Sequence, residues 1–261
     1  MAAGAVFSEY ARYYDLLYKD KNYAAEADYI HGLIQRYRPE TRTILELGAG
    51  TGKHAGLLSN HGYHVHGVER SEEMLEQAQR LAGELKQQDR QCLAPTFSLG
   101  DIRTARVEGR FDAVISLFHV VSYQTTNSDL IATFLTARGH LNTGGLFLFD
   151  VWYGPGVLTD RPVVRVKRMK DDCIEVTRIA EPVMHPQDNI VEVNYHVIIR
   201  NRETGHVDET RETHCMRYLF QPEIALLADH CGFYVDHSEE WLTGNPLSLE
   251  VWGACFILRV K

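Results

Sequence analysis

The chain has 261 residues, of which 44% are hydrophobic and 24% are charged, and its formal net charge is −8. This composition is typical of a globular protein and excludes a wholly disordered chain, and the length suits one α/β domain with an insertion or a small lid. The acidic balance disfavours a nucleic-acid partner, because such binding relies on cationic side chains that neutralise phosphates.

The cysteine pattern and the lengths of the apolar runs indicate the cellular compartment of the protein. The five cysteines are an odd number, are widely spaced and include no C-x-x-C motif. This pattern suits the reducing cytoplasm and predicts neither a disulfide framework nor a metal site. Residues 1–18 lack the basic stretch and apolar core of a signal peptide, and no apolar run approaches the length of a membrane span. We therefore expect a cytoplasmic protein with no membrane partner.

The first half of the chain alternates between strand-like and helix-like segments. Such alternation predicts an α/β fold with a mainly parallel sheet covered on both faces, and right-handed crossovers make it doubly wound. The predicted helices cover residues 23–37, 54–60, 71–87 and 129–140, and the predicted strands cover residues 43–47, 63–68, 96–99, 111–117 and 146–151, with a turn at 143–145 before the last strand.

After Asp150 the hydrophobic period changes to two, which is typical of antiparallel strands. The predicted strands cover residues 163–169, 173–183, 190–200 and 206–219, with a hairpin loop at 201–205. A helix over 222–230 and strands over 233–241 and 251–260 then return to the first pattern. We expect one domain over 1–152 and 217–261, with an antiparallel β subdomain inserted over 153–216.

Two clusters of charged or metal-binding residue types need separate interpretations. His61, His64 and His66 alternate around the start of a strand with no cysteine or carboxylate at ligand spacing, so we expect no metal there. The run 161–170 holds five basic residues. It is either the solvated face of a strand or a contact to an anionic group such as a phosphate.

The segment Glu46 to Gly52 carries the main functional signal. It follows a predicted strand and precedes a helix, which is where an open α/β sheet binds its ligand, and its glycines allow a sharp turn and close approach to that ligand. A dinucleotide site would require the spacing G-x-G-x-x-G, whereas this loop reads G-x-G-x-G and places Lys53 at the last position. Glu46 would repel a pyrophosphate and suits an ammonium group.

This loop resembles motif I of the class I S-adenosylmethionine (SAM)-dependent methyltransferases, and further landmarks follow in the family's order. Glu69 ends the second strand, where the family places an acid on the ribose hydroxyls. Gly100-Asp101-Ile102 is similar to the pair whose aspartate contacts the adenine amino group. The turn Leu141 to Gly145 is also similar, although Asn142 and Thr143 depart from the family's lysine and proline.

The resemblance implies a Rossmann-like methyltransferase fold with a seven-stranded sheet, an antiparallel insertion after the fifth strand, and SAM as cofactor. It also implies a set of cofactor-binding residues that lie along the first four strand ends and the N-terminal segment. These are Tyr14, Glu46, Gly48, Ala49, Gly50, Thr51, Gly52, Glu69, Arg70, Met74, Gly100, Asp101, Ile102, Leu117 and Phe118.

A narrower resemblance comes from Tyr13-Tyr14-Asp15-Leu16 followed by Tyr23. A similar tyrosine pair occurs in small-molecule methyltransferases that act on nucleotide-linked amino sugars, where one tyrosine packs near the methionine part of SAM. In that group the antiparallel insertion serves as an active-site cover or an oligomer surface. The resemblance implies Tyr14 as a cofactor contact and Tyr23 as a substrate contact. Ordinary helix packing is an equal alternative for Tyr10 and Tyr13.

The acceptor side of the site is expected at the ends of the fourth and fifth strands. His119 is the first candidate general base and Tyr123 the second, with a hydrogen-bonded structural role as the alternative for the histidine. Asp150, Trp152 and Tyr153 are candidates for the floor of the acceptor pocket, because a sugar ring stacks well on an aromatic face. Core packing is the alternative for the two aromatic residues.

The sequence therefore predicts methyl transfer to a small-molecule acceptor, an amine or hydroxyl of a sugar or nucleotide-sugar. An NAD(P)-dependent Rossmann oxidoreductase and a SAM-binding protein without catalysis are the alternatives, and a protein or RNA acceptor stays open. An antiparallel insertion with exposed strand edges also leaves a homodimer open.

Overall fold

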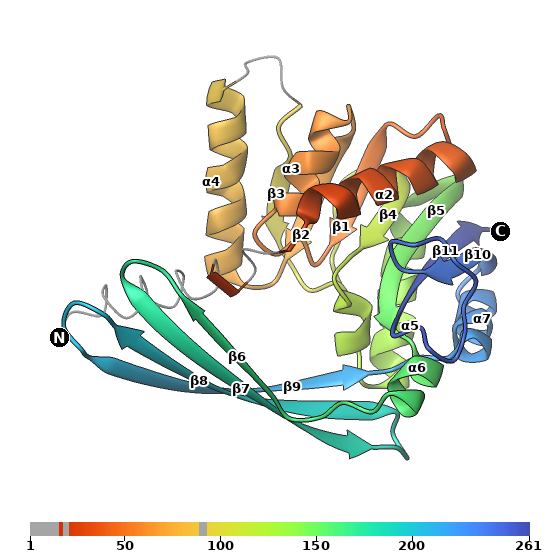
Figure 1. The fold of residues 1–261 in the computed structure, drawn as a ribbon. Helices are drawn as coiled ribbons and strands as arrows, with labels where there is room; N and C mark the ends of the chain where they lie inside the picture. Colours follow the sequence, from red (N-terminus) through yellow and green to blue (C-terminus); the bar gives the residue numbers. More distant parts are fainter. Residues whose placement is uncertain (1–15, 18–20, 89–92) are drawn as a thin grey trace. The chain divides into compact units, whose positions relative to one another are not determined.

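The computed structural model describes residues 16–17, 21–88 and 93–261 (Figure 1). Contacts within the chain divide it into two compact units. The larger unit consists of Tyr23–Asp160 and Arg217–Lys261, and the smaller consists of Arg161–Met216 with the described residues before Tyr23. Residues 153–160, which the sequence places in the insertion, thus group with the larger unit.

A seven-stranded sheet forms the centre of the larger unit, in the order β10-β11-β5-β4-β1-β2-β3. Strand β1 pairs in parallel with both β2 and β4, and β2–β3 and β4–β5 are parallel as well. Strand β11 lies antiparallel between β5 and β10. The strands are β1 (Thr43–Leu47), β2 (His64–Glu69), β3 (Thr96–Leu99), β4 (Phe111–Ser116), β5 (Leu141–Trp152), β10 (Phe233–Glu240) and β11 (Gly253–Val260). The predicted mainly parallel, doubly wound sheet is confirmed.

Helices cover both faces of this sheet, and the alternation of buried side chains along the strands shows why (Figure 1). On β5, Leu146 and Leu148 join the cluster packed against α2 and α3, whereas Phe147 and Phe149 join the cluster packed against α5 and α7. Successive side chains of a strand point to opposite faces of the sheet. When both faces are apolar, helices must cover both of them. The helices are α2 (Tyr23–Tyr37), α3 (Lys53–Asn60), α4 (Glu72–Gln88), η1 (Val120–Tyr123), α5 (Asn127–His140), α6 (Gly154–Thr159) and α7 (Gln221–His230).

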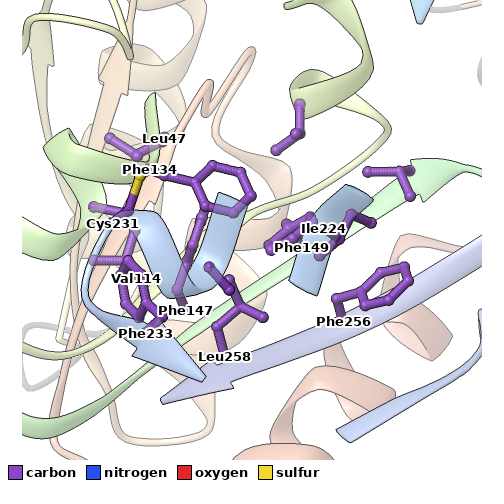
Figure 2. Close-up of a cluster of buried hydrophobic side chains, with 14 of the residues drawn as sticks. Leu47, Val114, Phe134, Phe147, Phe149, Ile224, Cys231, Phe233, Phe256 and Leu258 are labelled. Carbon is purple, nitrogen blue, oxygen red and sulfur yellow. The ribbon is translucent and has the colours of Figure 1, made fainter. Parts of the chain in front are cut away.

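The core on the α5/α7 face is rich in aromatic rings, as Figure 2 shows. Phe134 of α5 meets Phe147 edge-to-face with 5.5 Å between ring centroids, and Phe149 stacks on Phe256 at 5.9 Å. All four side chains are fully buried. Rings of this size contribute much of the apolar area that stabilises the fold, and they fix the carboxyl end of β5 relative to β4.

Two local predictions need correction. The turn predicted at 143–145 lies inside β5, because Leu141 pairs with Phe111 while Leu146 pairs with Ala113, so the extra residues form an irregularity within the strand. Helix α6 was not predicted, since Gly154-Pro155-Gly156 is typical of a turn. A Cβ on Gly156 would lie 2.0 Å from the carbonyl oxygen of Val251, so glycine lets this helix approach the chain before β11.

The smaller unit contains a four-stranded sheet in the order β6-β7-β8-β9, with β6–β7 and β7–β8 antiparallel. Its strands are β6 (Arg165–Lys170), β7 (Ile174–His185), β8 (Ile190–Asn201) and β9 (Val207–Arg217). A small apolar cluster that includes Val176, Val197 and Ile199 supports it. The predicted hairpin loop is confirmed, with Gly205 in the left-handed region at φ 71°. The basic side chains of β6 are exposed.

Among the residues that the structure describes, no group of three or more histidine, cysteine or acidic side chains is arranged to hold a metal ion. Within the same residues, no helix has both the length and the apolar character that crossing a bilayer requires.

Candidate active site

The loop between β1 and α3 turns on three glycines in the left-handed region, Gly48, Gly50 and Gly52, with φ values of 81°, 56° and 77°. A Cβ on Gly48 would lie 2.6 Å from Val120, and one on Gly52 would lie 2.6 Å from Phe97. These two positions therefore need glycine for close packing as well as for their backbone. Within the part of the chain that the structure describes, a Cβ on Gly50 would meet nothing within 4 Å, so the loop has open space there.

Glu46 lies on β1 immediately before this loop, and its carboxyl group is almost completely buried at 1% exposure. Among the residues that the structure describes, its Oε2 atom has no hydrogen-bond partner. Burial, with a smaller contribution from the charge of Glu69, raises the pKa of Glu46 to about 8, against an ordinary value of 4.5. A buried acid with an unsatisfied oxygen is costly to keep and suits a positively charged ligand group.

Glu69, at the end of β2, is bound to the loop from the neighbouring strand. Its Oε2 accepts a hydrogen bond from the backbone N–H of Gly50 at 2.9 Å, and its Oε1 accepts one from the N–H of Ser71 at 2.8 Å. The side chain is buried. The two bonds fix the carboxylate at the carboxyl end of the sheet, with acceptor capacity left for ligand hydroxyl groups.

The end of β3 brings Asp101 close to the same edge of the sheet. Gly100 donates its N–H to the carbonyl oxygen of Glu69 at 2.9 Å. The Asp101 carboxylate accepts bonds from the side chain of Arg103 at 2.6 and 2.9 Å, and this guanidinium lowers the pKa of Asp101. Arg103 also contacts Asp129 of α5 at 2.9 Å. The aspartate thus already has a cationic partner, which the sequence did not predict.

Strand β4 leads into a strained segment. Phe118 and His119 follow the buried Leu117 and have φ values of 65° and 60°, which non-glycine residues rarely adopt. Such strain costs about 1–3 kcal/mol per residue and concentrates at functional sites. Val120, the next residue, packs where Gly48 lacks a side chain, so this segment lies directly beside the glycine loop.

Asp150 of β5 holds the strained segment in place. Its fully buried carboxylate accepts the backbone N–H of His119 at 3.1 and 3.2 Å, and its Oδ2 lies 2.6 Å from Nδ1 of the His119 ring. The ring contact is short but is not aligned as a hydrogen bond. Two residues that the sequence proposed separately are therefore in direct contact.

The other acceptor-side residues lie nearby with differing exposure. Trp152 donates its backbone N–H to the Oγ of Ser122 at 3.0 Å, and the centroid of its ring lies 6.4 Å from that of the His119 ring. Tyr123 is 46% exposed on η1. Tyr153 is buried in the α5/α7 core cluster. Acceptor contacts by Tyr123, Trp152 and Tyr153 stay predictions.

Tyr23 lies at the start of α2, against the loop side of the site. Its ring meets that of His54 edge-on at 5.1 Å, and the Nζ of Lys53 lies 5.1 Å above it. His54 is buried and contacts Glu26 at 2.6 Å and Glu46 at 3.8 Å. Glu26 and His54 were not among the predicted site residues, although a polar Lys-His pair directly after the glycine loop was a signal for the histidine.

The remaining residues that were predicted to contact the cofactor differ in how far they are exposed. Ala49 and Ile102 are buried, Thr51 and Met74 are half-buried, and Arg70 is exposed. Tyr14 lies outside the described residues. Contact with a cofactor stays a prediction for each of them.

Comparisons with known proteins all indicate similarity to methyltransferases. Residues 44–145 match the family model of the methyltransferase domain. The chain is 27% identical over 245 residues to the dTDP-3-amino-3,4,6-trideoxy-alpha-D-glucopyranose N,N-dimethyltransferase of Streptomyces venezuelae, and the match covers 93% of this chain and 98% of the relative.

Solved structures agree with this fold. The crystal structure of Streptomyces venezuelae DesVI is 25% identical with a TM-score of 0.77, covering 97% of this chain and 98% of that one. A SAM-dependent methyltransferase from Clostridium acetobutylicum has a TM-score of 0.81 at 20% identity, covering 98% and 99%.

We expect Glu46→Gln to stabilise the protein without ligand in a pH-dependent way. Because the pKa of Glu46 is raised from 4.5 to about 8, the folded state retains a proton that the unfolded state loses, so folding stability falls as pH rises between these values. The uncharged amide of glutamine does not titrate, so the variant does not lose stability in this way as the pH rises.

The melting temperature of Glu46→Gln should exceed that of the wild type by several degrees at pH 8, with a smaller gap near pH 5. Glu84→Gln, on the exposed side of α4, serves as the control and should show no gap. An equal effect of Glu46→Gln at both pH values would contradict the buried, proton-bound state of this carboxyl.

Proposed function

We propose that this chain, which belongs to the class I SAM-dependent methyltransferases, transfers methyl groups to the amine of a nucleotide-linked amino sugar. Its cofactor, SAM, supplies a methyl group on a positively charged sulfur, and in-line displacement there depends mainly on alignment and exclusion of water. The observation that carries the acceptor class is the likeness to the Streptomyces venezuelae sugar-amine dimethyltransferase, which extends over nearly the whole of both chains.

The chemistry of the strand ends fits SAM. The unpartnered Oε2 of the buried Glu46 suits the ammonium of the methionine part. The Glu69 carboxylate, fixed by Gly50 and Ser71, suits the ribose hydroxyl groups as an acceptor. Asp101 would serve the adenine amino group beside its contact with Arg103. The open space over Gly50 supports close approach of a ligand to the loop.

His119 and Asp150 provide the acceptor-side chemistry. A carboxylate 2.6 Å from Nδ1 favours the tautomer that carries its proton on that atom, which leaves the Nε2 lone pair available to the acceptor. An amine must be neutral to attack the methyl group. His119 would therefore accept a proton from the amine. A hydroxyl acceptor, the other possibility from the sequence, would depend more strongly on this base.

Substitution of Gly50 tests the cofactor loop. Gly50 and Gly62 both have a positive φ and open space where a Cβ would lie, so alanine at either costs about 1 kcal/mol of stability for backbone reasons alone. Only Gly50→Ala should weaken the binding of S-adenosylhomocysteine, by about tenfold or more. Calorimetric titration measures the affinity of each variant. Equal affinities of the two variants would show that the loop is not part of the binding site.

A direct assay tests the acceptor class. With SAM and a dTDP-amino sugar, mass spectrometry should detect sugar carrying one and then two methyl groups, together with S-adenosylhomocysteine. The matched control is dTDP-glucose, which offers hydroxyl groups without an amine and should not react. Methylation of both would indicate O-methylation. Binding of SAM without turnover on any sugar nucleotide would favour the non-catalytic alternative.

Variants of the two candidate bases test the catalytic assignment. We expect His119→Ala to lower kcat by about 10²–10⁴-fold, the usual range for a general base, with little effect on cofactor affinity. Tyr123 is half exposed, and Tyr123→Phe should lower kcat less than tenfold. Unchanged turnover in both variants would place the acceptor site elsewhere.

A further inference from the structure

We propose that Glu26 and His54 form a positioning pair that holds Glu46 ready for the ammonium group of the cofactor, and that cofactor binding releases a proton from Glu46. The proposal rests on the assignment of SAM as the cofactor. It concerns two residues that do not belong to the glycine loop itself.

The pair is built from the first turns of two helices. His54 is the second residue of α3, and Glu26 lies in the first turn of α2. The His54 Nε2 atom lies 2.6 Å from Oε2 of Glu26, and both side chains are buried at 7% and 9% exposure. A buried ionisable pair of this kind fixes the orientation of the imidazole ring more strongly than a surface pair would.

The other ring nitrogen faces Glu46. The His54 Nδ1 atom lies 3.8 Å from Oε1 of Glu46, a separation longer than a hydrogen bond. This contact involves only one of the two carboxyl oxygens, since Oε2 has no hydrogen-bond partner within residues 16–17, 21–88 and 93–261. Glu26 therefore orients His54, the Nδ1 of His54 faces one oxygen of Glu46, and the second oxygen is left for a ligand.

The charged groups around Glu46 come from three elements. Strand β2 contributes Glu69, which repels a charge on Glu46, α3 contributes His54 together with a backbone hydrogen bond from Ala55, and α2 contributes Glu26 through His54. Burial and Glu69 outweigh the Ala55 hydrogen bond, so the pKa of Glu46 is about 8 and the group is mostly protonated at neutral pH. An incoming ammonium reverses this balance, because an opposite charge nearby favours the ionised carboxylate.

The sign of the pH dependence follows from this balance. Below about pH 8, Glu46 must lose its proton when the ammonium binds, so the affinity falls by up to about tenfold for each pH unit of acidification. Above about pH 8, Glu46 is already ionised without the ligand, so this gain in affinity with rising pH ends. The affinity for a ligand with an amino-acid moiety should therefore rise with pH up to about pH 8.

Calorimetric titration with two ligands tests the proposal. S-adenosylhomocysteine carries the amino-acid moiety, whereas 5′-methylthioadenosine has the same nucleoside without it. For the wild type between about pH 6 and about pH 8, we expect an affinity that rises with pH for the first ligand and a flat profile for the second. Titrations in buffers with different ionisation enthalpies should show proton release with the first ligand only.

Substitutions of the pair separate positioning from simple support of the fold. His54→Gln and Glu26→Gln should each weaken S-adenosylhomocysteine binding by about tenfold and leave 5′-methylthioadenosine binding unchanged. The matched control is His61→Gln at the other end of α3, where His61 contacts Asp28 of α2 at 2.9 Å on the surface. This control should change neither affinity.

The outcomes distinguish the proposal from its premise. If the wild type binds neither ligand, the assignment of SAM as cofactor fails and the positioning role fails with it. If the wild type binds both ligands with flat pH profiles, or if the variants weaken both ligands equally, the cofactor assignment stands and the positioning role is overturned. The wild-type profiles decide the proton linkage even if a variant does not fold.

Discussion

The parallel pairing of β1 with β4 is the constraint on which the site depends. These strands lie at the centre of the sheet, and the chain leaves them in opposite directions, through α3 on one face and through η1 and α5 on the other. Side chains at their carboxyl ends therefore meet at one edge, as expected for a doubly wound sheet. The Oγ of Ser116 donates to the carbonyl oxygen of Leu47 at 2.9 Å, which ties the two strand ends together.

Close packing then brings the cofactor loop and the acceptor segment together. Because Gly48 has no side chain, Val120 occupies the space beside it, and the strained Phe118-His119 segment follows the same path. Asp150 on the next strand stabilises this backbone by accepting the N–H of His119. The strain in one segment and the absence of a side chain in the other are thus two parts of one arrangement.

Much of the fold was predictable, because each strand and most helices follow a local hydrophobic period. The seven-stranded sheet, the inserted antiparallel strands and the Glu46-to-Gly52 loop all depend on residues close in sequence. The contacts that define the site depend instead on topology. His119 and Asp150 are separated by the whole of α5, and Glu26 and His54 by a strand, so no local pattern indicated either pair. Glu26 in particular looks like an ordinary acid in the first turn of a helix.

Two buried acidic side chains, Asp150 on β5 and Glu46 on β1, have different partners, which separates a structural role from a binding role. The carboxylate of Asp150 accepts the backbone N–H of His119 within the protein, so it holds a segment in place. Glu46 is equally buried, but among the described residues one of its oxygens has no partner. Because a buried acidic group with an unsatisfied oxygen is costly, a fold retains it only where another interaction offsets the cost. For Glu46 the cofactor's ammonium would do so, and for Asp150 none is needed.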